Sequence, residues 1–356
     1  MDKNLINELK EELERIENPM TFMEVCGTHT MAIGKMGLRN FLGNKVRLIS
    51  GPGCPVCVTP SIYIDYVYSL AVNRKISIVT YGDMLRVPGT SPYITLEKAR
   101  ALGGDIRLVY SSVDAIDIAL NEKNKEFLFL GIGFETTIPS TCVLLEDVLR
   151  KEINNLNILS LHKRVEPVMK KLMEDKNIKL DGFLCPGNVA VILGEEGFCF
   201  LKEYGQLGVI SGFREDEIIK SIIELIRNNG KSELINSYKS FVSKDGNILA
   251  KNLINKYFKE SQSLWRGIGN IDKSGLVLRD KYKKKDILNR FPLEEELKLI
   301  PKNKEKYLCR CGEVLKGKIL PCECNSFKRV CTPAFPIGPC MVSSEGTCAA
   351  YYKYEK

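Results

Sequence analysis

The sequence lacks the features that would direct a chain into or across a membrane. The first nineteen residues, MDKNLINELKEELERIENP, carry charges every few positions and contain no apolar stretch of the kind that a secretory signal needs. The longest apolar runs, such as 127–130 and 189–193, are far shorter than the ~18 residues of a membrane span. We therefore expect a cytosolic protein that makes no membrane contact.

A strong charge excess is missing as well. The 52 Lys and Arg residues outnumber the 44 Asp and Glu residues by only eight, and they are scattered along the chain. A dedicated nucleic-acid binder concentrates its positive charge, so we expect no nucleic-acid partner. The length of 356 residues, with 44% hydrophobic and 27% charged residues, is typical of a folded protein of two or three domains.

From about residue 21 to residue 213, short β-branched runs end in Gly or Pro turns and give way to helical stretches. This alternation predicts an α/β fold of βαβ units with parallel sheets. The candidate strands are 22–25, 47–49, 76–80, 106–110, 127–131, 158–161, 183–184 and 208–210. A polar break at 121–126 suggests two similar α/β lobes, assigned to residues 20–120 and 121–225. Residues 1–19 and 226–356 are expected to supply helical packing and a Cys-rich C-terminal domain.

Unusual residues gather at the carboxyl ends of these strands. Cys-Gly-Thr-His follows the first strand, Gly-Pro-Gly-Cys-Pro-Val-Cys the second, Tyr-Gly-Asp the third, Gly-Phe-Glu-Thr-Thr the fifth and Cys-Pro-Gly-Asn the seventh. In open parallel sheets, ligands bind in the crevice outside those ends. The motifs are therefore expected to converge although they lie far apart in the chain.

Cysteine is abundant but unevenly distributed. Seven of the thirteen cysteines fall within the forty residues from Cys309 to Cys348. In a reducing cytosol, such clusters bind metal or perform redox chemistry rather than form structural disulfides. Zinc knuckles need paired C-x2-C spacings, whereas the pairs here are C-x-C. The pattern favours an iron–sulfur cluster held by separated loops, with zinc as the alternative.

Two shorter motifs place further thiols near the N-terminus. Cys54 and Cys57 form a C-P-V-C turn after a strand, a spacing that suits either a reversible disulfide or a pair of metal ligands. Cys26 and His29 stand three residues apart at another strand end, where they could offer one metal or substrate a soft ligand and a proton donor. Glu135 follows an incomplete glycine pattern, so we expect it to provide proton transfer or hydrogen bonds in the same crevice rather than to bind a dinucleotide.

The chain resembles the HypD family of [NiFe]-hydrogenase maturation proteins in six segments, FMEVCGTHTMAI, SGPGCPVCVTP, YGDMLRVPG, GFETTIPST, PGNVAVILG and CTPAFPIGPCMVSSEGTCAAYY. The resemblance implies two similar α/β domains and a third domain that carries a [4Fe–4S] cluster. It also implies a scaffold that works with the small chaperone HypC while the Fe(CN)2CO group is built, with cyanide delivered from HypE. Such a protein is an assembly scaffold with redox activity rather than a conventional turnover enzyme.

The resemblance also assigns residues by motif. It makes Cys26 the iron-binding cysteine, with His29 beside it, and Cys54 with Cys57 the redox dithiol. The family's cluster spacing, C-x14-C-x6-C-x16-C, fits the four cysteines Cys309, Cys324, Cys331 and Cys348.

Spacing alone does not exclude another ligand set, since Cys311, Cys322 and Cys340 could each replace a neighbour. One position departs from the family, because Asn188 stands where Pro-Gly-His-Val is usual, and Asn cannot carry a proton at neutral pH. Two rival hypotheses are a thiol–disulfide oxidoreductase that is fed by the cluster and binds no iron at Cys26, and a zinc-stabilised binding module.

Overall fold

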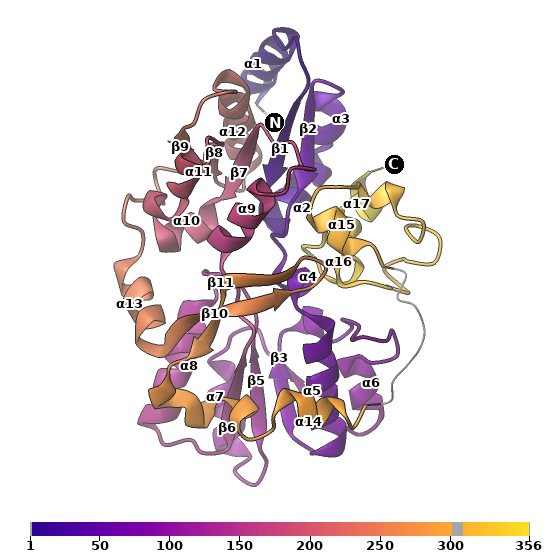
Figure 1. The fold of residues 1–356 in the computed structure, drawn as a ribbon, viewed down its shortest axis with the longest axis vertical. Helices are drawn as coiled ribbons and strands as arrows, with labels where there is room; N and C mark the ends of the chain where they lie inside the picture. The colour runs from indigo at the N-terminus through magenta and orange to yellow at the C-terminus, as the bar shows by residue number, and fades with distance from the viewer. Residues whose placement is uncertain (1, 301–308, 356) are drawn as a thin grey trace.

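The structure, a computed structural model, describes residues 2–300 and 309–355. Two lobes, each built on a parallel β-sheet, are stacked along the long axis of the molecule, and the cysteine-rich segment lies beside their junction (Figure 1). The predicted α/β fold with two parallel-sheet lobes and a separate cysteine-rich C-terminal region is confirmed. In the described part of the chain, no helix is both long enough and apolar enough to cross a membrane.

The first lobe holds a five-stranded sheet in the order β2-β1-β7-β8-β9, in which all pairs are parallel. Its strands are β1 (Met20–Glu24), β2 (Val46–Ser50), β7 (Gly182–Pro186), β8 (Leu207–Ser211) and β9 (Leu234–Asn236). Helix α12 (Glu215–Arg227) packs on β7 and β8, and α1 (Lys3–Glu14) packs on α12. Central strands are thus buried on both faces, which explains why β7 and β8 have no exposed residue.

The second lobe holds a four-stranded parallel sheet in the order β4-β3-β5-β6. Its strands are β3 (Ser77–Thr80), β4 (Ile106–Leu108), β5 (Phe127–Gly131) and β6 (Leu156–Ser160). All eight predicted strands are therefore present, with bounds that differ by a few residues. The strand β9 was not expected.

Helices connect and cover the two sheets. Besides α1 and α12 they are α2 (Gly27–Met36), α3 (Leu38–Leu42), α4 (Pro55–Val58), α5 (Ser61–Asn73), α6 (Leu96–Ala101), α7 (Asp114–Asn121), α8 (Ile138–Arg150), α9 (Val165–Met173), α10 (Gly187–Leu193), α11 (Phe200–Glu203), α13 (Ile248–Tyr257), α14 (Leu293–Leu297), α15 (Cys311–Leu315), α16 (Pro339–Val342) and α17 (Thr347–Tyr354). Short 3-10 turns are η1 (Gly82–Met84), η2 (Glu195–Phe198), η3 (Asp280–Lys285), η4 (Ile287–Asn289) and η5 (Pro321–Glu323).

The sheets do not follow the predicted division of the chain at residue 121. Strands β1 and β2 share a sheet with β7, β8 and β9, whereas β3 and β4 pair with β5 and β6. The chain therefore enters the second lobe after β2 and returns to the first lobe between β6 and β7. Hydrophobic patterns locate strands, but the pairing of strands depends on contacts between residues far apart in the chain.

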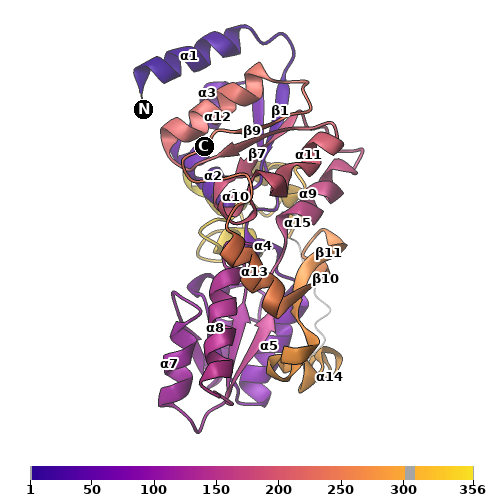
Figure 2. The same ribbon diagram turned by 90° about the vertical axis from the view of Figure 1, so that its left-hand side faces the viewer.

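The segment after residue 225, which was expected to be helical, contains an antiparallel hairpin. Its strands are β10 (Phe258–Trp265) and β11 (Gly269–Leu278). The hairpin and α13 cross between the two lobes (Figures 1 and 2). Only the first and last residues of β10 are fully buried, so its sequence carries almost none of the apolar alternation that marks a strand.

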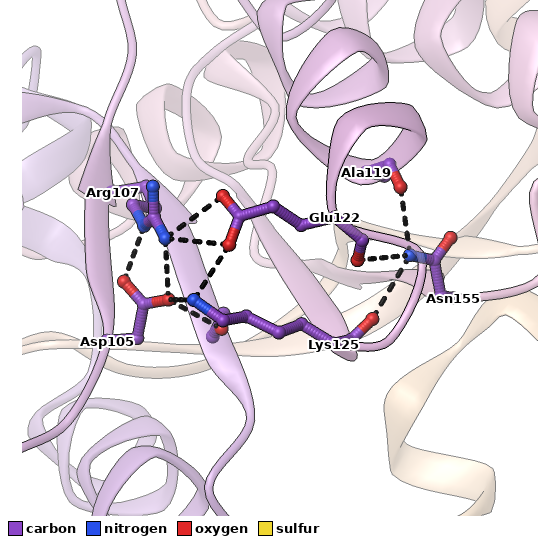
Figure 3. Close-up of polar contacts among 7 residues, drawn as sticks. Asp105, Arg107, Ala119, Glu122, Lys125 and Asn155 are labelled. Carbon is purple, nitrogen blue, oxygen red and sulfur yellow. Dashed lines mark hydrogen bonds and ion pairs between the residues drawn. The ribbon is translucent and has the colours of Figure 1, made fainter.

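Ion pairs join the loops at the amino end of the second sheet (Figure 3). Arg107 pairs with Asp105 at 2.5 Å and with Glu122 at 3.1 Å. Lys125 pairs with the same two acids at 3.1 and 2.7 Å. These side chains are partly exposed, so each pair contributes little stability on its own.

A side-chain amide in the same region has a stronger structural role. Asn155 Nδ2 donates hydrogen bonds to the main-chain oxygens of Ala119, Glu122 and Lys125 at 3.0, 3.4 and 3.1 Å (Figure 3). These oxygens belong to the end of α7 and the turn after it, where helical partners run out.

We expect Asn155→Ala to lower the free energy of unfolding by about 1–3 kcal/mol, because three main-chain oxygens lose one shared donor. Chemical denaturation of the purified protein measures this change. Asn124→Ala is the matched control, since Asn124 is an exposed amide in the same connection. Equal losses in the two variants would contradict the assignment.

Candidate functional site

The first two predicted motifs lie side by side. β1 and β2 pair in parallel with Glu24 opposite Ser50, so both segments leave the sheet at the same edge. The Gly27 N–H donates to the Gly53 carbonyl oxygen at 3.3 Å. A Cβ on Gly53 would lie 2.5 Å from the backbone of Cys26, so no other residue allows this approach.

Cys26 is a buried thiol at the start of α2, with 6% of its surface exposed. Burial and the nearby Glu345 carboxylate raise the pKa of Cys26 to about 11, although hydrogen bonds from His29 and Thr28 act in the opposite direction. The free thiol is therefore protonated at neutral pH. Because metals bind the thiolate, binding at Cys26 must release this proton.

Glu345 is a neighbour of Cys26 that sequence reasoning missed. Its Oε1 accepts a hydrogen bond from the Thr28 hydroxyl at 2.9 Å, across 317 residues of sequence. Burial raises the pKa of Glu345. A glutamate in a Ser-Ser-Glu-Gly run carries no signal that would connect it with a cysteine at the other end of the chain.

His29 is held by the loop that follows β8. Its ring stacks on Phe213 with the centroids 4.5 Å apart, and its Nε2 lies 2.8 Å from the Gly212 carbonyl oxygen. Burial lowers the pKa of His29 to about 4, so the ring is neutral at pH 7 and Nε2 is the donor in this contact. These contacts fix the position of the His29 ring, and its action as a proton donor stays a prediction.

Cys54 and Cys57 form a disulfide across the short helix α4. Both are buried, with 2% and 0% of their surfaces exposed. Helix α4 packs against α16, the helix that carries Cys340. The disulfide therefore lies beside the cysteine-rich segment, which is the arrangement that electron exchange between them would need.

Six cysteines of the C-terminal segment line one cavity. They are Cys309, Cys311, Cys324, Cys331, Cys340 and Cys348. Most of the other wall is apolar and includes Val314, Phe327, Ile337 and Met341. The set contains all four cysteines that fit the family spacing, whereas Cys322 is exposed and lies outside it.

The sulfur atoms around this cavity are a donor set that could hold a polynuclear cluster. Among residues 2–300 and 309–355, no three His, Cys, Asp or Glu side chains converge closely enough to hold one metal ion. A cluster is wider than an ion, so its thiolates can stand further apart. The Ile337 N–H donates to Cys331 Sγ and the Cys311 N–H to Cys309 Sγ, each at 3.4 Å, and bonds of this type tune cluster potentials.

The close packing of Gly338 on Cys309 also indicates a preformed site. A Cβ on Gly338 would collide with Cys309 Sγ, so glycine is needed for the sulfur to reach its position. On the other side of the segment, Asp83 of the Tyr-Gly-Asp motif accepts hydrogen bonds from the Ser343 hydroxyl and from the N–H and hydroxyl of Ser344, all at 3.0 Å. The third predicted motif thus binds the cysteine-rich segment.

Glu135 occupies a different place from the one expected. It lines a cavity between α8, α13 and the β10–β11 hairpin that shares no described residue with the cysteine cavity. Its Oε1 accepts a hydrogen bond from the Val165 N–H at 2.9 Å, and burial raises its pKa to about 7.

Comparison with known proteins identifies the family. A family model named HypD, described as the hydrogenase formation hypA family, matches residues 1–355. The chain belongs to the HypD family. The family is one of hydrogenase maturation factors, so the function implied by the resemblance is confirmed at this level.

Relatives from distant organisms match almost the whole chain. The chain is 41% identical to hydrogenase maturation factor HypD2 of Bradyrhizobium diazoefficiens, over 94% of this chain and 90% of that protein. It is 39% identical to a putative hydrogenase expression/formation protein of Methanocaldococcus jannaschii, over 99% and 95%. It is 36% identical to HypD of Escherichia coli, again over 99% and 95%.

We expect the Cys54–Cys57 disulfide to open under reductant and to re-form on mild oxidation. Acid quenching, unfolding and differential alkylation, read by mass spectrometry, measure both states. Cys142 and Cys185 are the controls, because they are buried single thiols that should stay free throughout. Equal labelling of Cys54 and Cys57 before and after oxidation would rule out a redox dithiol.

Proposed function

We propose that this hydrogenase maturation factor is the scaffold on which the Fe(CN)2CO group is assembled, with the iron held by Cys26. The observation that carries the proposal is the adjacency of a single thiol, a disulfide and a cysteine-lined cavity. The Cys26 backbone lies against Gly53, which directly precedes the Cys54–Cys57 disulfide. The helix that holds this disulfide packs on the cysteine-rich segment. A soft ligand for iron and a route for electrons are what such an assembly requires.

The residues around Cys26 favour the binding of a cation by its sulfur. Loss of hydration keeps the free thiol neutral, so the buried pocket does not hold an unpaired negative charge before iron arrives. The N–H groups at the start of α2 then favour the thiolate that forms on binding. Glu345, fixed by Thr28, lies close to Cys26, and in its ionised form it would attract a cation bound there.

A [4Fe–4S] cluster in the cysteine cavity, held by Cys309, Cys324, Cys331 and Cys348, would supply single electrons. Cys311 and Cys340 lie in the same cavity, within hydrogen-bonding contact of each other. Cys340 belongs to the helix that packs on α4, so it lies on the side of the cavity nearest the disulfide. We therefore assign Cys311 and Cys340 to the wall that faces Cys54 and Cys57 rather than to the ligand set.

The partners follow from the same proposal. A small HypC-like chaperone would share the iron, and a HypE-like donor would deliver cyanide. An alternative function is favoured by the packing of the disulfide on the cysteine-rich segment alone, namely a thiol–disulfide oxidoreductase fed by the cluster. The two functions differ in whether iron with CN and CO ligands is bound at Cys26.

We expect the anaerobically purified protein to contain about four iron and four sulfide ions per chain. Cys324→Ser should lose most of both, because its sulfur lines the cavity, whereas Cys322→Ser should keep them, because Cys322 is exposed. Metal analysis and the visible absorption spectrum measure these contents. A colourless protein with stoichiometric zinc would contradict the cluster, and iron loss in Cys311→Ser but not in Cys309→Ser would contradict the ligand set.

We expect Cys26→Ala, purified with the small partner, to keep its fold and its cluster spectrum and to lose the CN and CO infrared bands. Removing one small thiol costs little stability, but Ala offers no soft anionic donor for iron. Cys185→Ala is the control, since it removes a buried thiol at the end of a neighbouring strand. Infrared bands of normal intensity in Cys26→Ala would show that iron is held elsewhere.

A further inference from the structure

A second cavity of about 370 Å³ lies at the junction of the two lobes. Its walls come from α8 of the second lobe, the end of α10 in the first lobe, and the α13 and β10–β11 segments that cross between them (Figures 1 and 2). We propose that this cavity binds a small organic carboxylate with an apolar body. The proposal is independent of the scaffold function, because none of the cysteines that function uses lines this cavity.

Two of the cations in the cavity wall carry charge that no described carboxylate balances. Lys251 Nζ donates to the Asp245 carbonyl oxygen at 2.9 Å, and Arg279 Nε donates to the Asn255 carbonyl oxygen at 2.7 Å. Neither forms an ion pair with the described residues, in contrast to Arg164, which pairs with Glu166 and Glu260. Two uncompensated cations in a concave wall form a site for an anion.

Glu135 adds a buried hydrogen-bonding group to the same wall. Its Oε1 is satisfied by the Val165 N–H, but its Oε2 is buried and has no hydrogen-bond partner in the described part of the chain. A buried polar atom without a partner is costly, so a ligand that supplies the partner gains affinity. In its neutral form Glu135 can donate this bond to a carboxylate oxygen.

The remaining wall selects the body of the ligand. It is formed by the apolar side chains Ile138, Leu193, Ile254, Phe258 and Leu276. The volume lies at the lower end of the range for ligand pockets, so the ligand is small. The wall offers two cations that have no carboxylate partner among the described residues, and one carboxyl group that can donate a hydrogen bond. It therefore matches a single carboxylate better than a phosphate dianion, whose second charge would face Glu135.

Protonation of Glu135 makes this site sensitive to pH. Burial raises the pKa of Glu135 to about 7. The charged groups around it and in the cavity wall are Arg164, Glu166, Lys251, Lys259, Glu260 and Arg279. Above the pKa, Glu135 becomes an anion that repels the ligand. If only the neutral form binds, the affinity should fall about tenfold between pH 6 and pH 8, as the neutral fraction falls from about nine-tenths to about one-tenth.

The experiment is calorimetric titration of benzoate into the full-length, cluster-loaded protein at pH 6, 7 and 8. Benzoate has one carboxylate and a small apolar ring, and benzamide is its neutral control. We expect benzoate to bind with the tenfold pH dependence and benzamide to bind at least tenfold more weakly. Glu135→Gln keeps a donor that does not titrate, so it should bind benzoate with little pH dependence.

A charge variant tests the cations separately. Lys251→Gln/Arg279→Gln should weaken benzoate binding by tenfold or more, whereas Lys10→Gln, at an exposed site on α1, should leave it unchanged. The proposal is overturned if benzoate does not bind at millimolar concentration. It is also overturned if benzamide binds equally well, or if the double variant and Lys10→Gln bind benzoate alike.

Discussion

The parallel pairing of β1 with β2 is the constraint on which the site depends. It brings the ends of two strands to one edge, so that Cys26 and the Cys54–Cys57 turn meet through the backbone contact at Gly53. The contact joins the two backbones, so it depends on the register in which β1 and β2 pair rather than on side chains. A shift of the register by one residue would turn the β1 side chains to the opposite face of the sheet and move Cys26 away from Gly53.

The cysteine-rich segment is held in place by polar contacts with both lobes. Asp83 binds Ser343 and Ser344 from the second lobe, and Thr28 binds Glu345 from the first. These contacts lie in the turn between Cys340 and Cys348, both of which line the cysteine cavity. The segment consists of short helices and loops, so a bound cluster and these anchors would stabilise each other.

Several features of the fold were beyond sequence reasoning for identifiable reasons. The eight strands that were predicted could be found because they contain buried apolar runs, such as Phe-Leu-Phe-Leu in β5. The hairpin β10–β11 does not, because Phe258 and Trp265 are the only fully buried residues of β10. The exchange of strands between lobes was missed too, since a polar break in the chain marks a loop and not the boundary of a sheet.

Composition and spacing were sufficient to predict where the thiols lie along the chain: one at a strand end, two in a C-P-V-C turn and seven in a cysteine-rich tail. These features depend only on residue types and on short distances along the chain. Composition and spacing did not identify which residues surround these thiols. The contact of Thr28 with Glu345, the burial that keeps Cys26 protonated and the separation of Glu135 from the thiols all arise from segments that are distant in sequence. Such contacts form only when the sheets set the register and the lobes pack, and no local pattern encodes them.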